Sequence, residues 1–308
     1  MPRTLLQFCN VGSLFGGTGA CVASVVAALP DWSHSVRVRG RVEPSFAEAT
    51  GAEPLSVLTA SDCRGVDAVL LHNTAPNAVN GPLGFPTVQY VHSDGLRAVA
   101  DRTVCCSRHL SDVRGRDEPV LWQGVPRSTS DGPDPRPLRD RLLIGRLCTL
   151  TAAKWPPEVV DFYAALRDRI PPADFEFVGC PEPLQRPLRD ACGGNASFRP
   201  ASEDARSRLP RWDVLLYANR RVPETFGRTV AEAMRAGCVP VVDDLGGFRE
   251  QLDAGGGVAC RTLEDFAAAL RRLSDPAARR AASRQAVAVA DGRFSIAAFR
   301  RRLLGVLP

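Results

Sequence analysis

Lysine is almost absent from this 308-residue chain. Of its 39 basic residues, Lys154 is the single lysine and all the others are arginine. Isoleucine is also scarce, with three residues. The two shortages together indicate a GC-rich coding bias, which favours arginine at positions where lysine or arginine would serve equally well. A compact ammonium and a planar guanidinium are not equivalent. Lys154 therefore serves a site that needs a point charge, or it is a lysine by chance, and composition alone leaves both interpretations open.

The sequence also lacks the features of a membrane or exported protein. No run approaches the roughly 20 apolar residues that cross a bilayer, and the start, 1–9, has neither a basic segment nor a long apolar one. The ten cysteines are scattered between Cys9 and Cys260 without a C-x-x-C pair, and there are only four histidines. We therefore expect reduced thiols, no metal site and a cytoplasmic location.

Positive charge is concentrated in the second half of the chain. Residues 1–126 carry 10 basic and 11 acidic side chains, whereas residues 127–308 carry 29 and 23. An anionic ligand is therefore expected mainly on the C-terminal half. Most of these arginines alternate with acids and lack interleaved aromatics, as on an ordinary solvated surface, so nucleic acid is not the expected partner.

Short apolar runs that alternate with helical patterns predict an α/β fold. In the first half, strands are expected at 4–9, 35–39, 68–72, 87–91 and 103–106, and helices at 20–29 and 108–113. In the second half, strands are expected at 141–145, 175–178, 214–217, 239–242 and 257–260, with helices at 157–169, 203–209, 227–235, 248–252 and 263–273. Between the halves, 126–137 holds four prolines and is typical of a linker. This layout predicts two doubly wound, Rossmann-like domains facing each other across a ligand crevice.

A glycine-rich turn follows the first expected strand. Residues 12–19 read G-S-L-F-G-G-T-G and lead into a helix. Glycines such as Gly16 and Gly17 let a ligand approach the backbone, and a helix N-terminus favours negative charge. The spacing matches neither the dinucleotide nor the P-loop fingerprint. A ligand-binding loop and a plain strand-to-helix turn therefore remain equally open.

The strongest pattern covers 223–242, P-E-T-F-G-R-T-V-A-E-A-M-R-A-G-C-V-P-V-V. Glu224 falls in a loop after an expected strand, and Gly227 begins a helix whose N-terminal amides suit a phosphate. Glu232 is about 7.5 Å further along that helix, at 1.5 Å per residue. One carboxylate would then face a ribose and the other a group on the diphosphate. As a pattern alone, two surface glutamates on a capped helix are the more frequent case.

These residues resemble the donor-site signature of retaining GT-B glycosyltransferases of the family 4 type. The resemblance rests on the two glutamates and on the following G-G-F-R-E at 246–250. I-G-R-L at 144–147, followed by K-W-P at 154–156, resembles the start of that family's C-terminal domain. In the first half, V-H-S-D at 91–94 resembles its histidine loop, and L-W-Q-G-V-P at 121–126 resembles the segment that closes its N-terminal domain.

The resemblance implies a domain organisation for the whole chain. An N-terminal, acceptor-side domain would cover 1–126, a linker 127–140, and a nucleotide-sugar-binding domain 141–293. A terminal helix, 294–308, would pack back on the N-terminal domain. Its three arginines, 300–302, offer weak contact with anionic lipid as the minor interpretation.

The resemblance also implies a role for each site residue. Arg146 and Lys154 would neutralise the donor diphosphate and stabilise its departure. Glu232 would accept hydrogen bonds from the ribose, and Glu224 from hydroxyls of the transferred sugar. The remaining donor-site groups would be the backbone of Thr225, Phe226 and Gly227 at the leaving phosphate, His92 at the reacting face of the sugar, and the first loop at Gly16 and Gly17.

The implied activity is that of a retaining, metal-independent glycosyltransferase. It would move a hexose-like sugar from a nucleoside diphosphate sugar to an unknown hydroxyl acceptor, without a cofactor. Two features depart from the family pattern: the first domain is short, and Arg146 and Lys154 are eight positions apart. The alternative hypothesis is a non-catalytic sugar-nucleotide-binding subunit. An epimerase on a related scaffold would need a carboxylate and histidine set that the sequence lacks.

Overall fold

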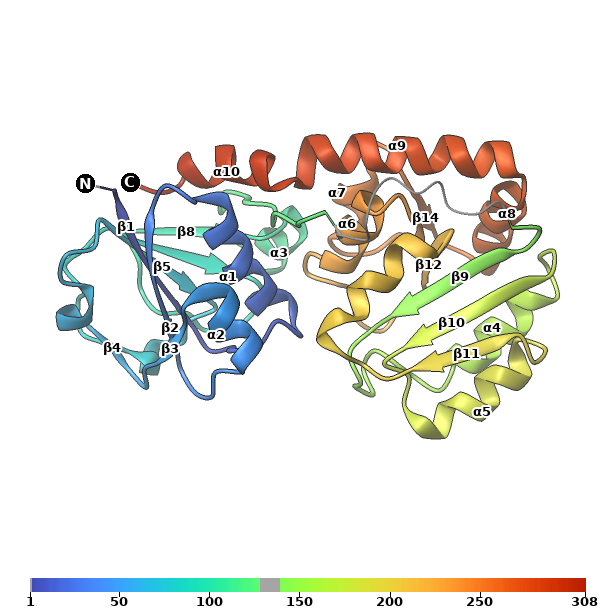
Figure 1. Cartoon of the computed structure of the whole chain (residues 1–308), viewed down its shortest axis with the longest axis horizontal. Coiled ribbons are helices and arrows are strands. Elements are labelled where there is room, and N and C mark those ends of the chain that lie inside the picture. The colour runs from blue at the N-terminus through green and yellow to red at the C-terminus, as the bar shows by residue number, and fades with distance from the viewer. Residues whose placement is uncertain (1, 128–138) are drawn as a thin grey trace. The chain divides into compact units, whose positions relative to one another are not determined.

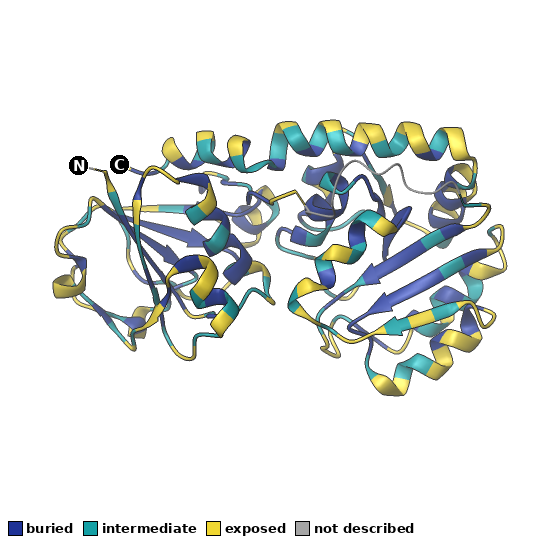
Figure 2. Ribbon diagram, in the orientation of Figure 1, coloured by how far each residue is buried: buried dark blue, intermediate teal, exposed yellow. Residues whose placement is uncertain are grey.

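The computed structural model describes residues 2–127 and 139–308, so most of the expected linker, 127–140, lies outside the described residues. The chain forms two compact units (Figure 1). Unit 1 comprises Met1–Val125 and Arg293–Pro308, and unit 2 comprises Pro126–Gly292. Each unit contains a six-stranded parallel sheet whose central strands are buried (Figure 2).

The sheet of unit 1 has the order β3-β2-β1-β5-β7-β8. Its strands are β1 (Thr4–Cys9), β2 (Ser33–Val38), β3 (Glu53–Pro54), β5 (Ala68–His72), β7 (Thr87–Val91) and β8 (Arg102–Cys105). Its helices are α1 (Gly17–Ala28), α2 (Pro44–Thr50), α3 (Arg108–Val113) and α10 (Ile296–Leu304). The near-continuous apolar runs of β1, β5 and β7 occupy the centre, because a parallel strand covered on both faces has no solvent side.

The two faces of this sheet are covered in different ways. On one face, Val22 of α1 and Phe46 of α2 pack against Val38 of β2. On the other, Leu6 and Leu71 pack against short elements and loops, which include β4 (Leu58–Thr59) and β6 (Val79–Asn80). The connections from β5 to β7 and from β7 to β8, both fully described, contain no α-helix. Loops and short elements therefore make both of these connections.

Unit 2 has the sheet order β11-β10-β9-β12-β13-β14. Its strands are β9 (Leu142–Leu147), β10 (Ala173–Val178), β11 (Ala196–Arg199), β12 (Val214–Tyr217), β13 (Val239–Asp243) and β14 (Val258–Cys260). Its helices are α4 (Val159–Arg167), α5 (Glu182–Ala191), α6 (Arg228–Arg235), α7 (Phe248–Leu252) and α8 (Leu263–Ser274), and α9 (Pro276–Phe294) begins in this unit. In both units the sheet order reverses direction along the chain, as a doubly wound fold requires.

The structure confirms the predicted α/β class with two parallel-sheet domains. The sequence patterns missed the helices α2, α5 and α9, the strand β11, and the two-residue strands β3, β4 and β6. Helix α5 escaped because Pro183 and Pro187 interrupt its pattern, although the first is at a helix start, where proline is tolerated. The expected helix at 203–209 is a 3₁₀ helix, Glu203–Arg211, which contains Pro210. A proline restricts the preceding residue and removes a backbone donor, so a regular α-helix does not extend across it.

The last helix, α10, belongs to unit 1. Phe299 is fully buried in it, and a Cβ on Gly124 would lie 2.6 Å from the Phe299 side chain. Glycine at 124 therefore lets the closing segment of the first domain approach this helix. None of the helices in the described ranges combines the length and the apolar character that crossing a bilayer requires.

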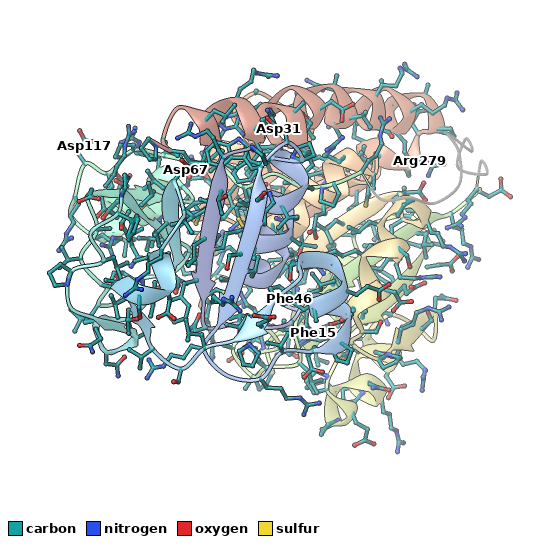
Figure 3. The ribbon with its side chains drawn as sticks, turned by 60° about the vertical axis from the view of Figure 1, so that its left-hand side comes forward. Phe15, Asp31, Phe46, Asp67, Asp117 and Arg279 are labelled. Carbon is teal, nitrogen blue, oxygen red and sulfur yellow. The ribbon has the colours of Figure 1, made fainter. Side chains whose placement is uncertain are left out.

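Two of the three consecutive arginines of α10 are engaged within unit 1. Arg300 forms an ion pair of 2.6 Å with Asp31, which lies beside the helix (Figure 3). Arg302 lies over the ring of Trp122 at 5.5 Å. The charge left for a lipid surface at this helix is therefore smaller than the sequence indicates.

Candidate active site

The donor-binding residues predicted in unit 2 lie on neighbouring elements. Arg146 is near the end of β9, Lys154 is in the turn that follows, and Glu224 is in the loop after β12. Strands β9 and β12 are adjacent in the sheet, and Glu232 is in α6, which follows that loop. Doubly wound sheets bind ligands outside the carboxyl ends of their strands. The structure brings Lys154 and Glu224 into contact at this edge.

Lys154 and Glu224 form an ion pair between Nζ and Oε1. The same Oε1 accepts a hydrogen bond of 2.7 Å from the hydroxyl of Tyr217, the last residue of β12. Burial raises the pKa of Tyr217 well above its ordinary value, so its hydroxyl remains a donor. The two charged side chains are 22% and 21% exposed, which leaves the pair open to solvent on one side. Sequence reasoning missed Tyr217, because an aromatic residue at the end of an apolar strand is typical of a core position.

Arg146 is fully buried beside this pair. Its guanidinium lies over the rings of Trp155 and Tyr217, at 4.9 and 4.8 Å. It donates to the carbonyls of Lys154, at 2.8 Å, and Ala218, at 3.1 Å. A buried cation is costly unless other groups take the place of water, and here ring faces and carbonyls do so. Arg146 therefore holds the Lys154 turn in place, and its direct contact with a diphosphate stays a prediction.

A second side chain also fixes the Lys154 turn. Asn219 is almost fully buried and donates from Nδ2 to the carbonyl of Ala153 at 2.7 Å. Its backbone N–H donates to the carboxylate of Asp243, the last residue of β13. Burial raises the pKa of Asp243 above its ordinary value. Asp243 thus ends its strand, and Asn219 is a positioning residue that no sequence pattern indicated.

The loop that carries Glu224 packs closely against two glycines. A Cβ on Gly247 would lie 2.4 Å from the carbonyl oxygen of Thr225, and one on Gly246 would lie 2.4 Å from that of Glu224. Gly247 N donates to the Glu224 carbonyl at 2.8 Å. The G-G-F-R-E motif therefore has a physical role, because only glycine permits this approach of the two backbones.

The end of the same loop is held from α7. The fully buried Gln251 donates from Nε2 to the carbonyls of Phe226 and Gly227. Gly227 adopts a positive φ of 79° as the N-cap of α6, which glycine tolerates best. These contacts fix the backbone at Phe226 and Gly227, where α6 begins. The binding of a phosphate by the backbone of 225–227 stays a prediction.

Glu232 is 6% exposed within α6. Its Oε1 accepts from Arg228 Nε at 2.7 Å and from Arg206 Nε at 2.9 Å. Its Oε2 has no hydrogen-bond partner among the described residues. One acceptor of Glu232 is thus open to a ligand, and its contact with a ribose hydroxyl stays a prediction. The two arginines were not identified from sequence, where they are two of many.

In unit 1, Gly16 and Gly17 begin α1. Gly16 is its N-cap, and no atom lies within 4 Å of a Cβ built at either glycine. The steric need for glycine lies instead at Gly12 and Gly19, where a Cβ would be 2.3 Å and 1.9 Å from backbone oxygens. Packing therefore requires glycine at the two ends of the turn, whereas the space beside its central glycines is open. A donor contact at Gly16 and Gly17 stays a prediction.

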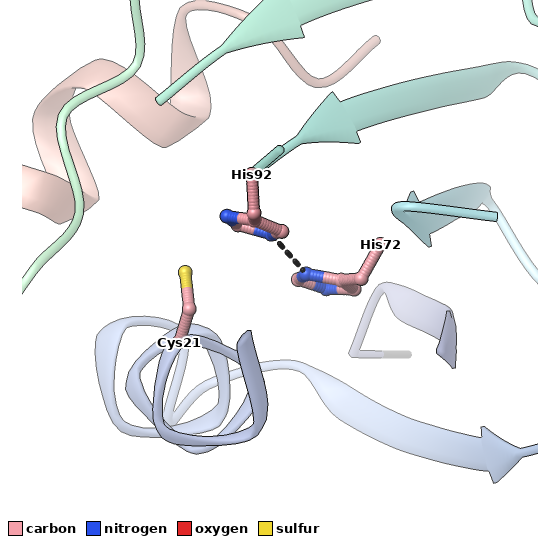
Figure 4. Close-up of side chains that lie close together, drawn as sticks. All are labelled: Cys21, His72 and His92. Carbon is pink, nitrogen blue, oxygen red and sulfur yellow. Dashed lines mark hydrogen bonds between the residues drawn. The ribbon is translucent and has the colours of Figure 1, made fainter. Parts of the chain in front are cut away.

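His92 lies at the end of β7 in a buried chain of polar side chains (Figure 4). Gln123 Nε2 donates to His92 Nδ1 at 3.0 Å, so the proton of this ring is on Nε2. His92 Nε2 then donates to His72 Nδ1, and His72 Nε2 to Gln7 Oε1, each at 3.0 Å. Both imidazoles are therefore neutral, with defined tautomers. The contact of His92 with a sugar stays a prediction, because both ring nitrogens have partners within unit 1.

Cys21, His72 and His92 are the described residues whose donor atoms come close enough to suggest a metal site, all within 4.8 Å of one another. The ring planes of the histidines differ by 5°. Their centroids are 5.3 Å apart, close to the largest separation that a 3.0 Å bond between ring nitrogens allows, so the rings lie end to end. The facing nitrogens thus point at each other and not at a common third point, which is the geometry of a hydrogen bond between the two rings.

His72 should make unit 1 less stable in mild acid. Burial lowers the pKa of His72 to about 3. Below pH 6.5 the unfolded ring binds a proton that the folded ring does not, so stability falls as the pH falls. We expect a loss of about 2 kcal/mol between pH 7 and pH 5, and in His72→Gln this part of the loss should disappear. Native-state hydrogen exchange of the buried β5 amides reports the unfolding free energy of this unit.

The control is His34→Gln, a half-buried residue of β2, which should keep the wild-type difference between pH 7 and pH 5. The substitution at His72 also removes packing contacts and so lowers the unfolding free energy at every pH. The comparison therefore uses the difference in unfolding free energy between pH 7 and pH 5 within each variant. A wild-type pH difference in His72→Gln would show that His72 is not the neutral ring described here.

The comparisons with known proteins concern the second domain and the fold. Residues 140–275 match the family model described as "Glycosyl transferases group 1". A search of curated proteins finds no match to the sequence. HepE from Anabaena, in complex with UDP, has a TM-score of 0.75 and 16% identity, over 98% of this chain and 99% of that chain.

Two further solved structures match over nearly the whole length. A glycosyltransferase from Rickettsia africae ESF-5 has a TM-score of 0.73 and 15% identity, over 99% of this chain and 97% of that chain. Sucrose-phosphate synthase from Thermosynechococcus elongatus has a TM-score of 0.71 and 13% identity, over 99% and 98%. At these identities the likeness concerns the fold. The chain has the GT-B fold of these structures, and its residues 140–275 match the glycosyl transferases group 1 family model.

Proposed function

We propose that this chain is a retaining, metal-independent glycosyltransferase that moves a hexose-like sugar from a nucleoside diphosphate sugar to a hydroxyl acceptor. The observation that carries the proposal is the cluster of Arg146, Lys154, Tyr217 and Glu224 at the carboxyl edge of the unit 2 sheet. The group 1 match over 140–275 supports it. So do solved structures of the same fold, since HepE has been crystallised with UDP and with UDP and glucose.

In the proposed site, the diphosphate binds between Lys154 and the first turn of α6. The ammonium is a point charge that can follow the charge as it grows on the leaving phosphate, and the α6 amides beside Gly227 add donors of fixed direction. Arg146 contributes a fixed positive charge behind them. About one turn further along α6, the unused oxygen of Glu232 accepts a ribose hydroxyl.

Retention follows in this proposal from attack on the face that the diphosphate leaves. The bond between the anomeric carbon and the phosphate oxygen breaks, and the acceptor oxygen forms its bond on the same face. The acceptor proton passes to the departing phosphate, so no enzyme nucleophile is needed. The charge that must be stabilised is that of the phosphate, which is what the cations and amides of unit 2 are placed to do.

Donor hydrolysis without an acceptor tests this chemistry. A thermal-shift series with UDP, GDP, ADP and dTDP first selects the base, because a ligand at 100 times its dissociation constant stabilises by about 2.7 kcal/mol. Proton NMR of the matching sugar nucleotide then reads the anomer released before mutarotation. We expect the donor's anomeric configuration, and the same rate in excess chelator.

Three outcomes would contradict parts of the proposal. Inversion would exclude retention, and loss of activity in chelator with rescue by magnesium or manganese would exclude a metal-independent mechanism. Nucleotide binding without hydrolysis or transfer would instead favour the non-catalytic binding subunit. The loops that replace helices in unit 1 are the observation on the side of that alternative.

A further inference from the structure

The Lys154–Glu224 ion pair joins two groups that the proposed function assigns to different parts of the donor. Lys154 is to bind the diphosphate and Glu224 the sugar, yet in the unliganded chain each neutralises the other. The ammonium has three N–H donors, but a phosphate oxygen that binds Lys154 competes with Glu224 for its positive charge and places a second anion beside this carboxylate. Entry of the diphosphate therefore weakens the Lys154–Glu224 pair.

Tyr217 holds the Glu224 side chain in place when a diphosphate binds Lys154. Its hydroxyl donates to the same Oε1 that contacts Lys154. The Tyr217 side chain is itself fixed, because it is buried, contacts the Phe248 ring edge-on with centroids 5.4 Å apart, and lies under the Arg146 guanidinium. Glu224 is therefore held at the end of β12 even without Lys154, and it does not turn freely into water.

We propose that this pair is exchanged on binding, and that the exchange makes the site prefer the sugar nucleotide over the bare nucleoside diphosphate. The inference rests on the proposed function. When a sugar nucleotide enters, its diphosphate takes Lys154 and the sugar hydroxyls replace the ammonium as donors to Glu224. When the bare nucleoside diphosphate enters, nothing replaces the ammonium. A carboxylate that is only 21% exposed is then left close to an anion.

This difference has a direct physical cost. Removing one partner of a partly buried ion pair leaves a charge that neither water nor protein solvates well, and like charges repel at short range. The cost applies to the product of the reaction and not to the substrate. Tyr217 is in this account a specificity-determining residue, because it keeps the Glu224 carboxylate close to the bound diphosphate. The resulting repulsion weakens binding of the nucleoside diphosphate product and so favours its release.

Calorimetric titration with UDP and with UDP-glucose tests the exchange. Glu224→Gln keeps the shape of the side chain and removes its charge, so Lys154 is free for phosphate. We expect its UDP affinity to rise about fivefold, the scale of a part-exposed ion pair, while its UDP-glucose affinity falls. Tyr217→Phe should shift both affinities in the same directions by a smaller factor, because Glu224 can then turn toward water.

Matched controls separate this effect from general changes. Glu158→Gln removes an exposed carboxylate that pairs with Arg221, and it should bind UDP and UDP-glucose like the wild type. In the Lys154→Ala background, Glu224→Gln should raise the UDP affinity by a smaller factor than in the wild type, since only repulsion remains to be relieved. This coupling is the signature of exchange.

The outcomes also separate the inference from the function on which it rests. If UDP binds and Glu224→Gln leaves its affinity unchanged or lowers it, the exchange is wrong and the donor site stands. The same holds if the effect of Glu224→Gln does not depend on Lys154. If the wild-type chain binds none of the four nucleoside diphosphates and no sugar nucleotide, the proposed function itself fails.

Discussion

Lys154→Ala should lower the rate of donor turnover more than any other single charge removal in unit 2. Removing one group that stabilises a developing anion typically costs about 10²–10³ in rate, and we expect a loss of this size in kcat/KM for donor hydrolysis or transfer. Lys154→Arg should also lose about tenfold, because a planar fork does not reproduce a compact ammonium between Glu224 and a phosphate. Steady-state kinetics at equal protein stability provide the measurement.

Arg221→Ala is the control for Lys154. Arg221 is an exposed arginine that pairs with Glu158 in the same unit, so its removal changes the net charge equally without touching the Tyr217–Glu224 cluster. This variant should keep nearly full activity. Full activity in Lys154→Arg would remove the argument that the single lysine was retained because the site needs a point charge.

Gly247→Ala should disable the donor loop while leaving the fold intact. The φ of Gly247 is −66°, which any residue adopts, so the substitution acts through space alone. Its Cβ would be 2.4 Å from the Thr225 carbonyl oxygen and 2.9 Å from the Phe226 Cα, and the 224–226 backbone must move away. Misplacement of a site by about 1 Å can cost roughly 10²-fold in rate. We expect a loss of this order, with about 1–3 kcal/mol of destabilisation from overpacking.

The control for Gly247 is Gly292→Ala in α9. No atom lies within 4 Å of a Cβ at Gly292, and alanine favours a helix more than glycine does, so this variant should be as active and at least as stable as the wild type. Circular dichroism and thermal unfolding establish that Gly247→Ala is folded. Wild-type turnover in a folded Gly247→Ala would mean that the 224–227 loop does not need its observed position.

Much of the fold follows from patterns within short segments. The apolar runs of β1, β5, β7 and β12 are long enough, and their flanking turns clear enough, to predict buried parallel strands. Some errors lie where a local signal is broken by proline, as in α5, or where an element is short, as in β11. The long helix α9 was missed because its apolar residues, mostly alanine, do not form a distinct stripe. The packing of the loops between β5 and β8 could not be predicted either, because it involves residues from several segments.

The sequence by itself determined which chemical groups are available. They are a single lysine, two glutamates eight positions apart with the start of a helix at a glycine between them, and a glycine pair after the next strand. Local spacing suffices for these, because a helix start and a tight turn depend on neighbouring residues. Only the tertiary structure decided how the groups are paired. Lys154 and Glu224 are 70 positions apart, and they meet because β9 and β12 lie side by side, with Tyr217 at the end of one strand and Arg146 near the end of the other. Partners so distant in the chain depend on strand order and packing, which no local pattern encodes.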